Sequence, residues 1–134
     1  MTDTFNIDII QDDARGILRI VAAGPMESVR FVDAQIAKLS ALDAPWAYNR
    51  IMELSEVNGA CAYEELARFA AWWTSIRFDI DRTIRMAMLS RNGLTVARLP
   101  TMELMFPRHE MRAFDDLAEA EAWVSRDDWQ KPKK

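Results

Sequence analysis

The sequence predicts an α/β fold with a mixed five-stranded sheet, and its elements follow the order β-β-α-β-α-β-α-β-α. Two strand patterns near the N-terminus are separated by a turn that is too short for a crossover, so they must form an antiparallel hairpin. After this hairpin, helical and strand patterns alternate, which is typical of mainly parallel strands joined by right-handed helical crossovers. The chain of 134 residues has the size of one domain, which we place at 1–125, followed by a polar C-terminal tail at 126–134.

Five segments have the apolar patterns of strands. In the first, Phe5, Ile7 and Ile9 alternate with other residues, which is the period of a half-buried strand. Gly16 belongs to the turn that follows, because glycine is free to adopt positive φ, and the second strand is more continuously apolar. The expected strands are 5–11, 17–23, 46–54, 83–89 and 110–114.

Four segments have the patterns of helices. In the first two, apolar residues recur at a spacing of three and four, as on the buried face of an amphipathic helix. Pro100 cannot lie inside a helix without breaking a hydrogen bond, so the third segment is expected to form two pieces, with a new turn that starts at the proline. Asp115 or Asp116 is the expected N-cap of the last helix. The expected helices are 26–42, 62–78, 94–106 and 115–124.

The composition argues against several classes of function. The net charge is −4 and the pI is about 5.0, so the chain lacks the basic balance that bulk nucleic-acid binding usually needs. One cysteine, Cys61, and one histidine, His109, exclude an internal disulfide and a zinc site made of Cys and His alone. Four glycines are too few for a glycine-rich phosphate loop. We expect no metal and no cofactor.

We expect no targeting or membrane segment. Residues 1–4 lack the basic and apolar regions of a signal peptide, and no stretch approaches the roughly 18 apolar residues of a membrane span. A lone cysteine fits a reducing compartment. We therefore expect a bacterial-type cytoplasmic protein without a membrane span.

Four segments carry motifs that occur together in one known family. Residues 50–57, RIMELSEV, resemble a strand that ends in D-L-S-x-V, with Glu53 in place of Asp. Residues 82–89, RTIRMAML, are similar to a strand with the pattern R-x-A-x-V, and residues 92–99, NGLTVARL, to a helix start with the pattern G-x-x-R. Residues 111–124, MRAFDDLAEAEAWV, are similar to a closing helix with the pattern v-R-v-F-x-d-x-x-e-A-x-x-W-L. In this order and spacing, the motifs resemble the SpoIIAA-like branch of the STAS superfamily, small bacterial domains related to anti-sigma-factor antagonists.

The resemblance covers roughly residues 5–125 and implies a SpoIIAA-like fold and a protein-binding habit, not an activity. In the antagonists, a serine at the start of the second helix is phosphorylated by a kinase that is also the binding partner. The matching stretch here, 58–63, holds no serine or threonine, and Ser55 lies before it. We therefore expect no phosphoserine switch of that kind.

The loops after the third and fourth strands form the candidate site. Ligands of parallel α/β sheets bind at the carboxyl ends of the strands, and a helix N-terminus offers free N–H groups to an anion. We expect a ligand or a partner carboxylate to dock between residues 55–61 and 91–98; alternatively, Arg98 pairs with an acid such as Glu103 or Asp79. The candidate binding residues are Ser55, Asn58, Gly59, Cys61, Trp72, Arg91, Asn92 and Arg98.

Three side chains each have two open interpretations. Cys61 lies beside a predicted helix N-terminus, which either lowers its thiol pKa or, as the favoured alternative, leaves it a small half-buried cap. His109 could titrate near neutral pH, but a lone histidine forms neither a metal site nor a triad, so we expect it at the surface or a strand edge. Trp72, beside Trp73, either widens the core contact or lines a pocket or a subunit interface.

Two functions are consistent with these observations. The first is a non-enzymatic protein-interaction or regulatory module that binds a protein partner or itself as a homodimer. The alternative is a binder or sensor of a small apolar or amphipathic anionic ligand, in which Trp72 and methionines line a pocket and Arg91 or Arg98 meets the anionic head. An enzyme ranks third, because no nucleophile–base pair and no metal set can be assembled. The methionines are Met86, Met88, Met102, Met105 and Met111.

Overall fold

A mixed five-stranded sheet lies at the centre of the structure, a computed structural model that describes residues 4–76 and 82–125. Its strands are β1 (Asn6–Asp12), β2 (Ile17–Pro25), β3 (Asn49–Asn58), β4 (Ile84–Leu89) and β5 (His109–Ala113). They lie side by side in chain order; β1 and β2 are antiparallel, and the later neighbours are parallel. The predicted fold class is confirmed, since each parallel connection contains helix, as a crossover requires.

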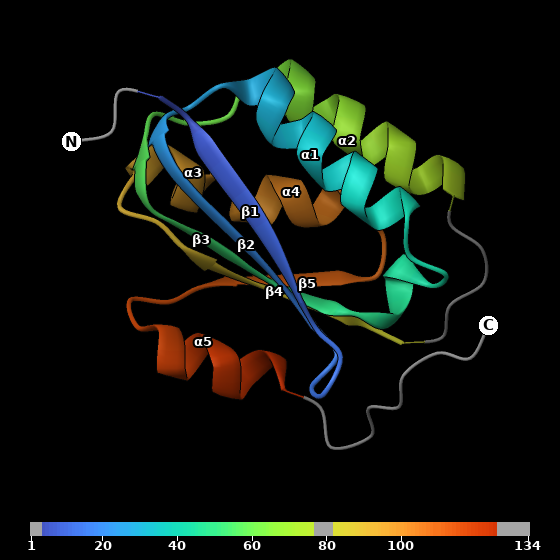
Figure 1. The fold of residues 1–134 in the computed structure, drawn as a ribbon. Helices are drawn as coiled ribbons and strands as arrows, with labels where there is room; N and C mark the ends of the chain where they lie inside the picture. Colours follow the sequence, from blue (N-terminus) through green and yellow to red (C-terminus); the bar gives the residue numbers. More distant parts are fainter. Residues whose placement is uncertain (1–3, 77–81, 126–134) are drawn as a thin grey trace.

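Helices cover the two faces of the sheet unequally (Figure 1). They are α1 (Ser28–Ser40), α2 (Tyr63–Ile76), α3 (Gly93–Ala97), α4 (Leu99–Met105) and α5 (Leu117–Val124). The first four lie over one face and α5 lies over the other (Figure 1). Two apolar cores result: a large one under the first four helices, and a small one in which Ala120 and Val124 of α5 pack on Ile51 and Ala87.

The alternation of side chains along β3 and β4 divides their residues between these two cores. Arg50 pairs with Met86, and Met52 pairs with Met88. These four residues face the large core or the cavity within it, whereas Ile51, between two of them, belongs to the small core. Every second residue of the central strands is therefore aimed at the helices α1 to α4.

Two strands extend beyond the ends that their sequence patterns indicated. β2 includes Gly24 and Pro25, which we expected to terminate it. Gly24 has φ of +93°, and a Cβ there would lie 2.4 Å from the backbone oxygen of Thr4, so this position requires glycine. β3 continues through Asn58, because its pairing with β2 resumes after a register shift. The expected loop at 55–59 is therefore mostly strand.

The remaining boundaries differ by a few residues. A 3₁₀ turn, η1 (Pro45–Ala47), occupies the start of the expected third strand. The break between α3 and α4 falls at Arg98, and Pro100 is the second residue of α4, where a missing N–H is tolerated. Asp116, one of the two expected caps, accepts a hydrogen bond from the backbone N–H of Ala118 at 2.7 Å. Residues 77–78 of the second expected helix and the tail 126–134 lie outside the described residues.

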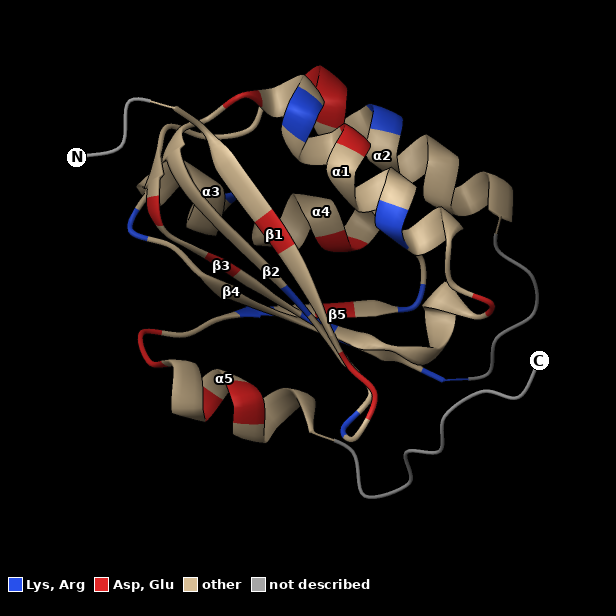
Figure 2. Cartoon of the chain, viewed as in Figure 1, with Lys and Arg blue, Asp and Glu red and all other residues tan. Residues whose placement is uncertain are grey.

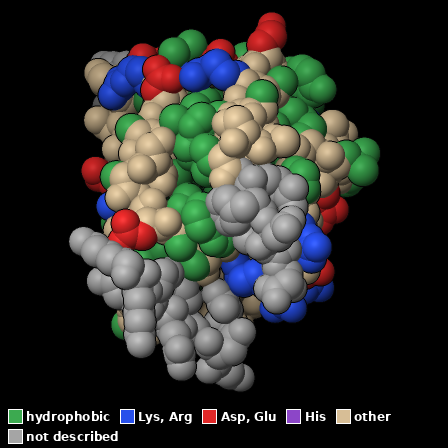
Figure 3. All heavy atoms as spheres, turned by 90° about the vertical axis from the view of Figure 1, so that its right-hand side faces the viewer, with side chains coloured by type: hydrophobic (Ala, Val, Ile, Leu, Met, Phe, Trp, Pro, Cys, Tyr) green, Lys and Arg blue, Asp and Glu red, His purple; other side chains and the backbone are tan. Residues whose placement is uncertain are grey.

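Charged side chains lie mainly on the outer surfaces of these layers. Figure 2 shows acidic and basic residues along α1 and α2, none of them buried, and acidic residues on α5. Figure 3 turns toward the viewer the side at which the parallel strands begin, where hydrophobic side chains lie between charged ones of both signs. A few polar and charged side chains are buried instead, among them Gln35, Arg50 and His109, and these belong to the candidate site.

Candidate functional site

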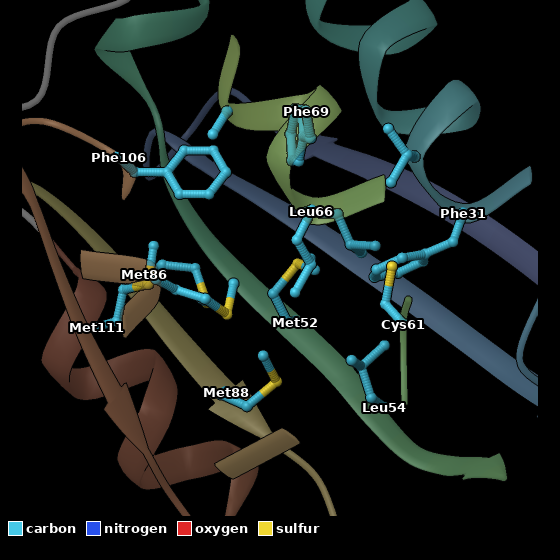
Figure 4. Packing of buried hydrophobic residues seen from close by; sticks show 14 of the residues in the cluster. Phe31, Met52, Leu54, Cys61, Leu66, Phe69, Met86, Met88, Phe106 and Met111 are labelled. Carbon is cyan, nitrogen blue, oxygen red and sulfur yellow. The ribbon is translucent and has the colours of Figure 1, made fainter. Parts of the chain in front are cut away.

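An apolar cavity lies within the large core, between the sheet and the helices α1 to α4. Its volume is about 40 Å³. Side chains from β3, β4 and β5 enter it from one side, and aromatic and aliphatic residues of the helices close it from the other (Figure 4). Thioether side chains are flexible and polarizable, so a cavity built from them adapts its shape easily. The methionines that line it are Met26, Met52, Met86, Met88, Met102 and Met111.

A buried arginine forms one wall of this cavity. Arg50 is the second residue of β3 and is only 3% exposed. Its Nη2 donates a hydrogen bond to Nε2 of His109 at 2.8 Å, and its guanidinium carbon lies 5.4 Å from the centre of the Trp73 ring. Its Nη1 is buried without a hydrogen-bond partner. Burial lowers the pKa of Arg50 to about 10, so the side chain is still a cation at neutral pH.

No carboxylate among the described residues forms an ion pair with Arg50. A buried charge is normally paired, because removing it from water costs several kcal/mol. Here the positive charge has only a neutral imidazole and an aromatic ring as partners. The site is therefore electrostatically suited to an anion.

His109 is held neutral by its surroundings. Arg50 can only donate to it, so Nε2 of His109 is the acceptor, and the ring proton is on Nδ1, which donates to the backbone oxygen of Pro107 at 3.1 Å. Burial, and after it the positive charge of Arg50, lowers the pKa of His109 to about 3. His109 begins the edge strand β5, as one of the two expected placements had it, but it does not lie at the surface, because the rings of Trp73 and Phe106 pack edge-on against it.

Two further polar atoms are buried without partners near this part of the core. Gln35 of α1 donates from Nε2 to the backbone oxygen of Phe31 at 3.1 Å, but its Oε1 has no hydrogen-bond partner. Nε1 of Trp73 is also unpaired. Gln35 and Arg50 both line the cavity. Because buried polar groups are nearly always satisfied in folded proteins, unpaired atoms on two cavity residues indicate a place where a polar ligand or water fits.

The lining residues that are partly exposed, Met26, Thr95 and Arg98, follow the carboxyl ends of β2 and β4, so we place the mouth of the cavity there. Nη1 of Arg98, at the junction of α3 and α4, donates to the backbone oxygen of Cys61. Nearby, Oγ of Ser28 accepts a hydrogen bond from the backbone N–H of Ala62 at 2.8 Å. Segments 55–61 and 91–98 are thus brought together, and Arg98 bridges them. It forms none of the ion pairs among the described residues, where Glu103 instead accepts from the backbone N–H of Met111; Asp79, the other acid considered, lies outside them.

The other candidate residues of the two segments lie around this mouth. Ser55 is half-buried in β3, and Asn58 ends the strand with its backbone oxygen accepting from the N–H of Met26 at 2.8 Å. Gly59 is exposed with φ of +93°. Arg91 is exposed, whereas the side-chain oxygen of Asn92 caps α3 by accepting from the N–H of Thr95 at 3.0 Å.

Trp72 does not line the cavity. It is half-buried, packs against the large core and stacks on Phe69 with ring centres 6.2 Å apart. Its neighbour Trp73 is the tryptophan that reaches the buried arginine. Met105 is likewise absent from the lining. The interpretation of Trp72 as a wider core contact is the one that the packing favours.

Cys61 lines the cavity but lacks the environment of a reactive thiol. It is 7% exposed, and burial raises its pKa, with a hydrogen bond from Ser28 acting in the opposite direction. The thiolate, not the thiol, is the nucleophile, so the thiol is expected to be inert in the folded protein.

Alkylation by iodoacetamide at neutral pH tests this directly, because the chain has one cysteine. We expect folded protein to react at least about tenfold more slowly than free cysteine, and denatured protein to react at a rate like that of free cysteine. A folded-state rate equal to or above that of free cysteine would contradict the expectation.

Sequence reasoning missed Arg50, Gln35 and Trp73 as site residues. A signal for Arg50 was present, since it occupies the same alternating register as Met52 and Leu54, whose side chains are apolar. A charged residue in that register is placed in the core, whereas the same residue one position away faces the other side of the sheet.

Two solved structures share this architecture. One is an uncharacterised protein of the DUF3478 family from Shewanella loihica PV-4, described as having a SpoIIAA-like fold. It is 15% identical to this chain with a TM-score of 0.59, and the match covers 92% of this chain and 98% of that one. This chain has a SpoIIAA-like fold. The second is an anti-sigma factor antagonist from Mycobacterium paratuberculosis, 16% identical with a TM-score of 0.57 over 92% of this chain and 97% of that one.

The SpoIIAA-like fold confirms the resemblance inferred from the sequence motifs. No protein-family model matches the chain, and no curated protein matches it. Within the described part of this SpoIIAA-like domain, no helix combines the length and the apolar character that crossing a bilayer requires.

Proposed function

We propose that this SpoIIAA-like domain is a non-enzymatic protein-interaction module with a regulatory role, and that its interaction surface surrounds the carboxyl ends of the parallel strands. The likeness in fold to an anti-sigma factor antagonist supports a module of this class. The location of the exposed apolar side chains supports the position of the surface. Both arguments concern binding and neither requires a chemical step.

The observation that carries the proposal is the exposure of three apolar side chains at the starts of three helices. Val29, Tyr63 and Leu94 are each more than half exposed, and they belong to the first turns of α1, α2 and α3. The bond from Ala62 to Ser28 joins the starts of α1 and α2, and the bond from Arg98 to Cys61 joins the end of the short helix α3 to the start of α2. Large apolar and aromatic side chains exposed as a group mark interaction sites more often than isolated ones.

The two residues most often used in catalysis are poorly suited to it here. His109 is neutral, buried and committed to Arg50 through Nε2 and to Pro107 through Nδ1. Cys61 is buried with a raised pKa. Neither side chain is free to act as a base or a nucleophile in this arrangement, which supports a function by binding.

The start of α2 lacks the hydroxyl that a phosphoserine switch needs. Segment 58–63 contains no serine or threonine, and the hydroxyl that lies against it belongs to Ser28, which accepts from Ala62. Partner binding is therefore proposed to be independent of phosphorylation at this position.

Affinity capture with matched leucine variants tests the surface. Leu94→Glu places a charge in the proposed surface, while Leu104→Glu makes the same change at an exposed leucine of α4 that lies outside it. From cells that express the gene naturally, we expect wild-type protein and L104E to retain the same partner, and L94E to retain at least about tenfold less of it, as for an interface hot spot. Equal retention by both variants would contradict the proposed surface.

A second copy of this chain is one of the proposed partners. Native mass spectrometry of the purified protein gives the subunit count, and L94E is expected to shift a dimer toward monomer while L104E does not. A monomeric wild-type protein that also retains no partner would contradict the interaction function as a whole.

A further inference from the structure

We propose that the methionine-lined cavity binds an aliphatic carboxylic acid, with the carboxylate against Arg50 at the inner end and the chain directed toward the mouth at Arg98. This inference does not depend on the protein contacts proposed above. It rests on a buried unpaired cation, Arg50, on the apolar lining of the cavity, and on the order in which Arg50 and the apolar residues follow one another along one face of β3.

The cation supplies the anchor for the head group. Arg50 is buried, its Nη1 has no partner, and its other observed partners are the uncharged groups of His109 and Trp73. A carboxylate placed at Nη1 gains a charge-assisted hydrogen bond and neutralises a charge that the fold otherwise leaves uncompensated. An uncharged head group offers only the hydrogen bond.

Gln35, which also lines the cavity, has a second unpaired polar atom. Oε1 of Gln35 is an acceptor and therefore cannot bind a carboxylate directly. A water molecule between the two can donate one hydrogen to each. The side-chain amide is held in this orientation because Nε2 donates to Phe31.

The lining supplies the chemistry for an aliphatic chain. From Arg50, the side chains of Met52 and Leu54 follow on the same face of β3, and this stretch of strand spans about 13 Å at the usual rise per residue. The neighbouring strands add Met88 and Met111. The polar side chains of Thr95 and Arg98 enter at the mouth, so a chain that points outward from Arg50 meets apolar atoms for most of its length.

The cavity must widen to hold such a molecule, because its present volume is about 40 Å³. The lining allows this, since methionine side chains repack with little strain. The bond from Arg98 to the backbone of Cys61 joins two residues of the lining at the mouth, and it is a side-chain contact at a partly exposed position that can open without disturbing the sheet.

Octanoate and 1-octanol are the probes that separate the head-group contact from the chain contact. By isothermal titration calorimetry, we expect wild-type protein to bind octanoate at least about tenfold more tightly than 1-octanol, the factor that one charge-assisted hydrogen bond provides. In Arg50→Met the preference for octanoate is lost while 1-octanol still binds. In Arg98→Met, the matched change at the mouth, the preference remains.

The methyl groups of methionine report where octanoate binds in the wild-type protein. In protein labelled with ¹³C-methyl methionine, octanoate is expected to shift the NMR resonances of Met52, Met88 and Met111, which line the cavity. The resonance of Met105, which does not line the cavity, is expected to stay unchanged. This measurement on wild-type protein decides the matter if R50M fails to fold.

Four results would overturn the proposal. They are the absence of octanoate binding at millimolar concentration, equal affinity for octanoate and 1-octanol, loss of the preference in R98M but not in R50M, and methionine shifts confined to Met105. The first result would mean that ordered water, and not a carboxylic acid, occupies the cavity. The third would place the head group at the mouth, between segments 55–61 and 91–98, as the sequence predicts.

Discussion

Replacing Trp73 by alanine is expected to lower the free energy of unfolding by about 3–5 kcal/mol, the range for large-to-small changes in a packed core. Trp73 is only 1% exposed, and its ring covers both the Arg50 guanidinium and the His109 ring. Removing it leaves a void beside a buried cation, so the loss of apolar contacts is accompanied by the loss of the cation–π contact of Arg50.

Trp72→Ala is the matched control, because it removes the same side chain one residue away. Trp72 is half-buried at the margin of the core, and we expect a loss of only about 1 kcal/mol, the centre of the range for single substitutions. Urea unfolding followed by circular dichroism measures both losses. Equal losses would mean that the two tryptophans have similar roles, contrary to the packing described above.

The stability of the protein is expected to fall as the pH is lowered through the range in which an exposed histidine takes up a proton. The pKa of His109 is lowered to about 3 in the folded protein, while that of an unfolded chain is about 6.5. Below the unfolded value the unfolded state binds the additional proton, so the native state loses up to about 1.4 kcal/mol per pH unit. Above the unfolded value this contribution to stability is fully present.

His109→Gln isolates this effect from the titration of carboxylates, which both proteins share. An amide oxygen can still accept from Arg50, but it does not titrate. The groups that act on His109 are the charges of Arg50 and Arg82 and the rings of Trp73 and Phe106. Unfolding free energies measured between about pH 7.5 and pH 4.5 should diverge below about pH 6.5, with the wild type falling more steeply. Parallel profiles would show that His109 titrates normally.

The fold was predictable because its signals are local. The hairpin followed from the shortness of one turn and the parallel strands from the alternation with helices. The end of β3 was not predictable in this way: Ser55 to Asn58 read as a loop, yet they pair with β2 after a register shift. Pairing between distant segments determines such an end, and no local pattern reports it.

The mouth of the candidate site was predictable and its interior was not. The rule that parallel sheets bind ligands at the carboxyl ends of strands brought segments 55–61 and 91–98 together in the prediction, and Arg98 joins them in the structure. Arg50 was missed, and the burial of His109 was not foreseen, because burial of a polar side chain depends on what packs over it. Trp73 of α2, which is distant in sequence from both residues, packs over Arg50 and His109, and Phe106 packs against His109 from the end of α4.

The division of the central strands between two cores has a consequence for how this protein can vary. Residues that touch the cavity, such as Arg50 and Met52, alternate with residues that support α5, such as Ile51. Substitutions at alternate positions can therefore retune the chemistry of the cavity while the layer beneath α5 keeps its packing. The sheet acts as a partition, and a protein engineer could exchange the lining on one side of it as an independent unit.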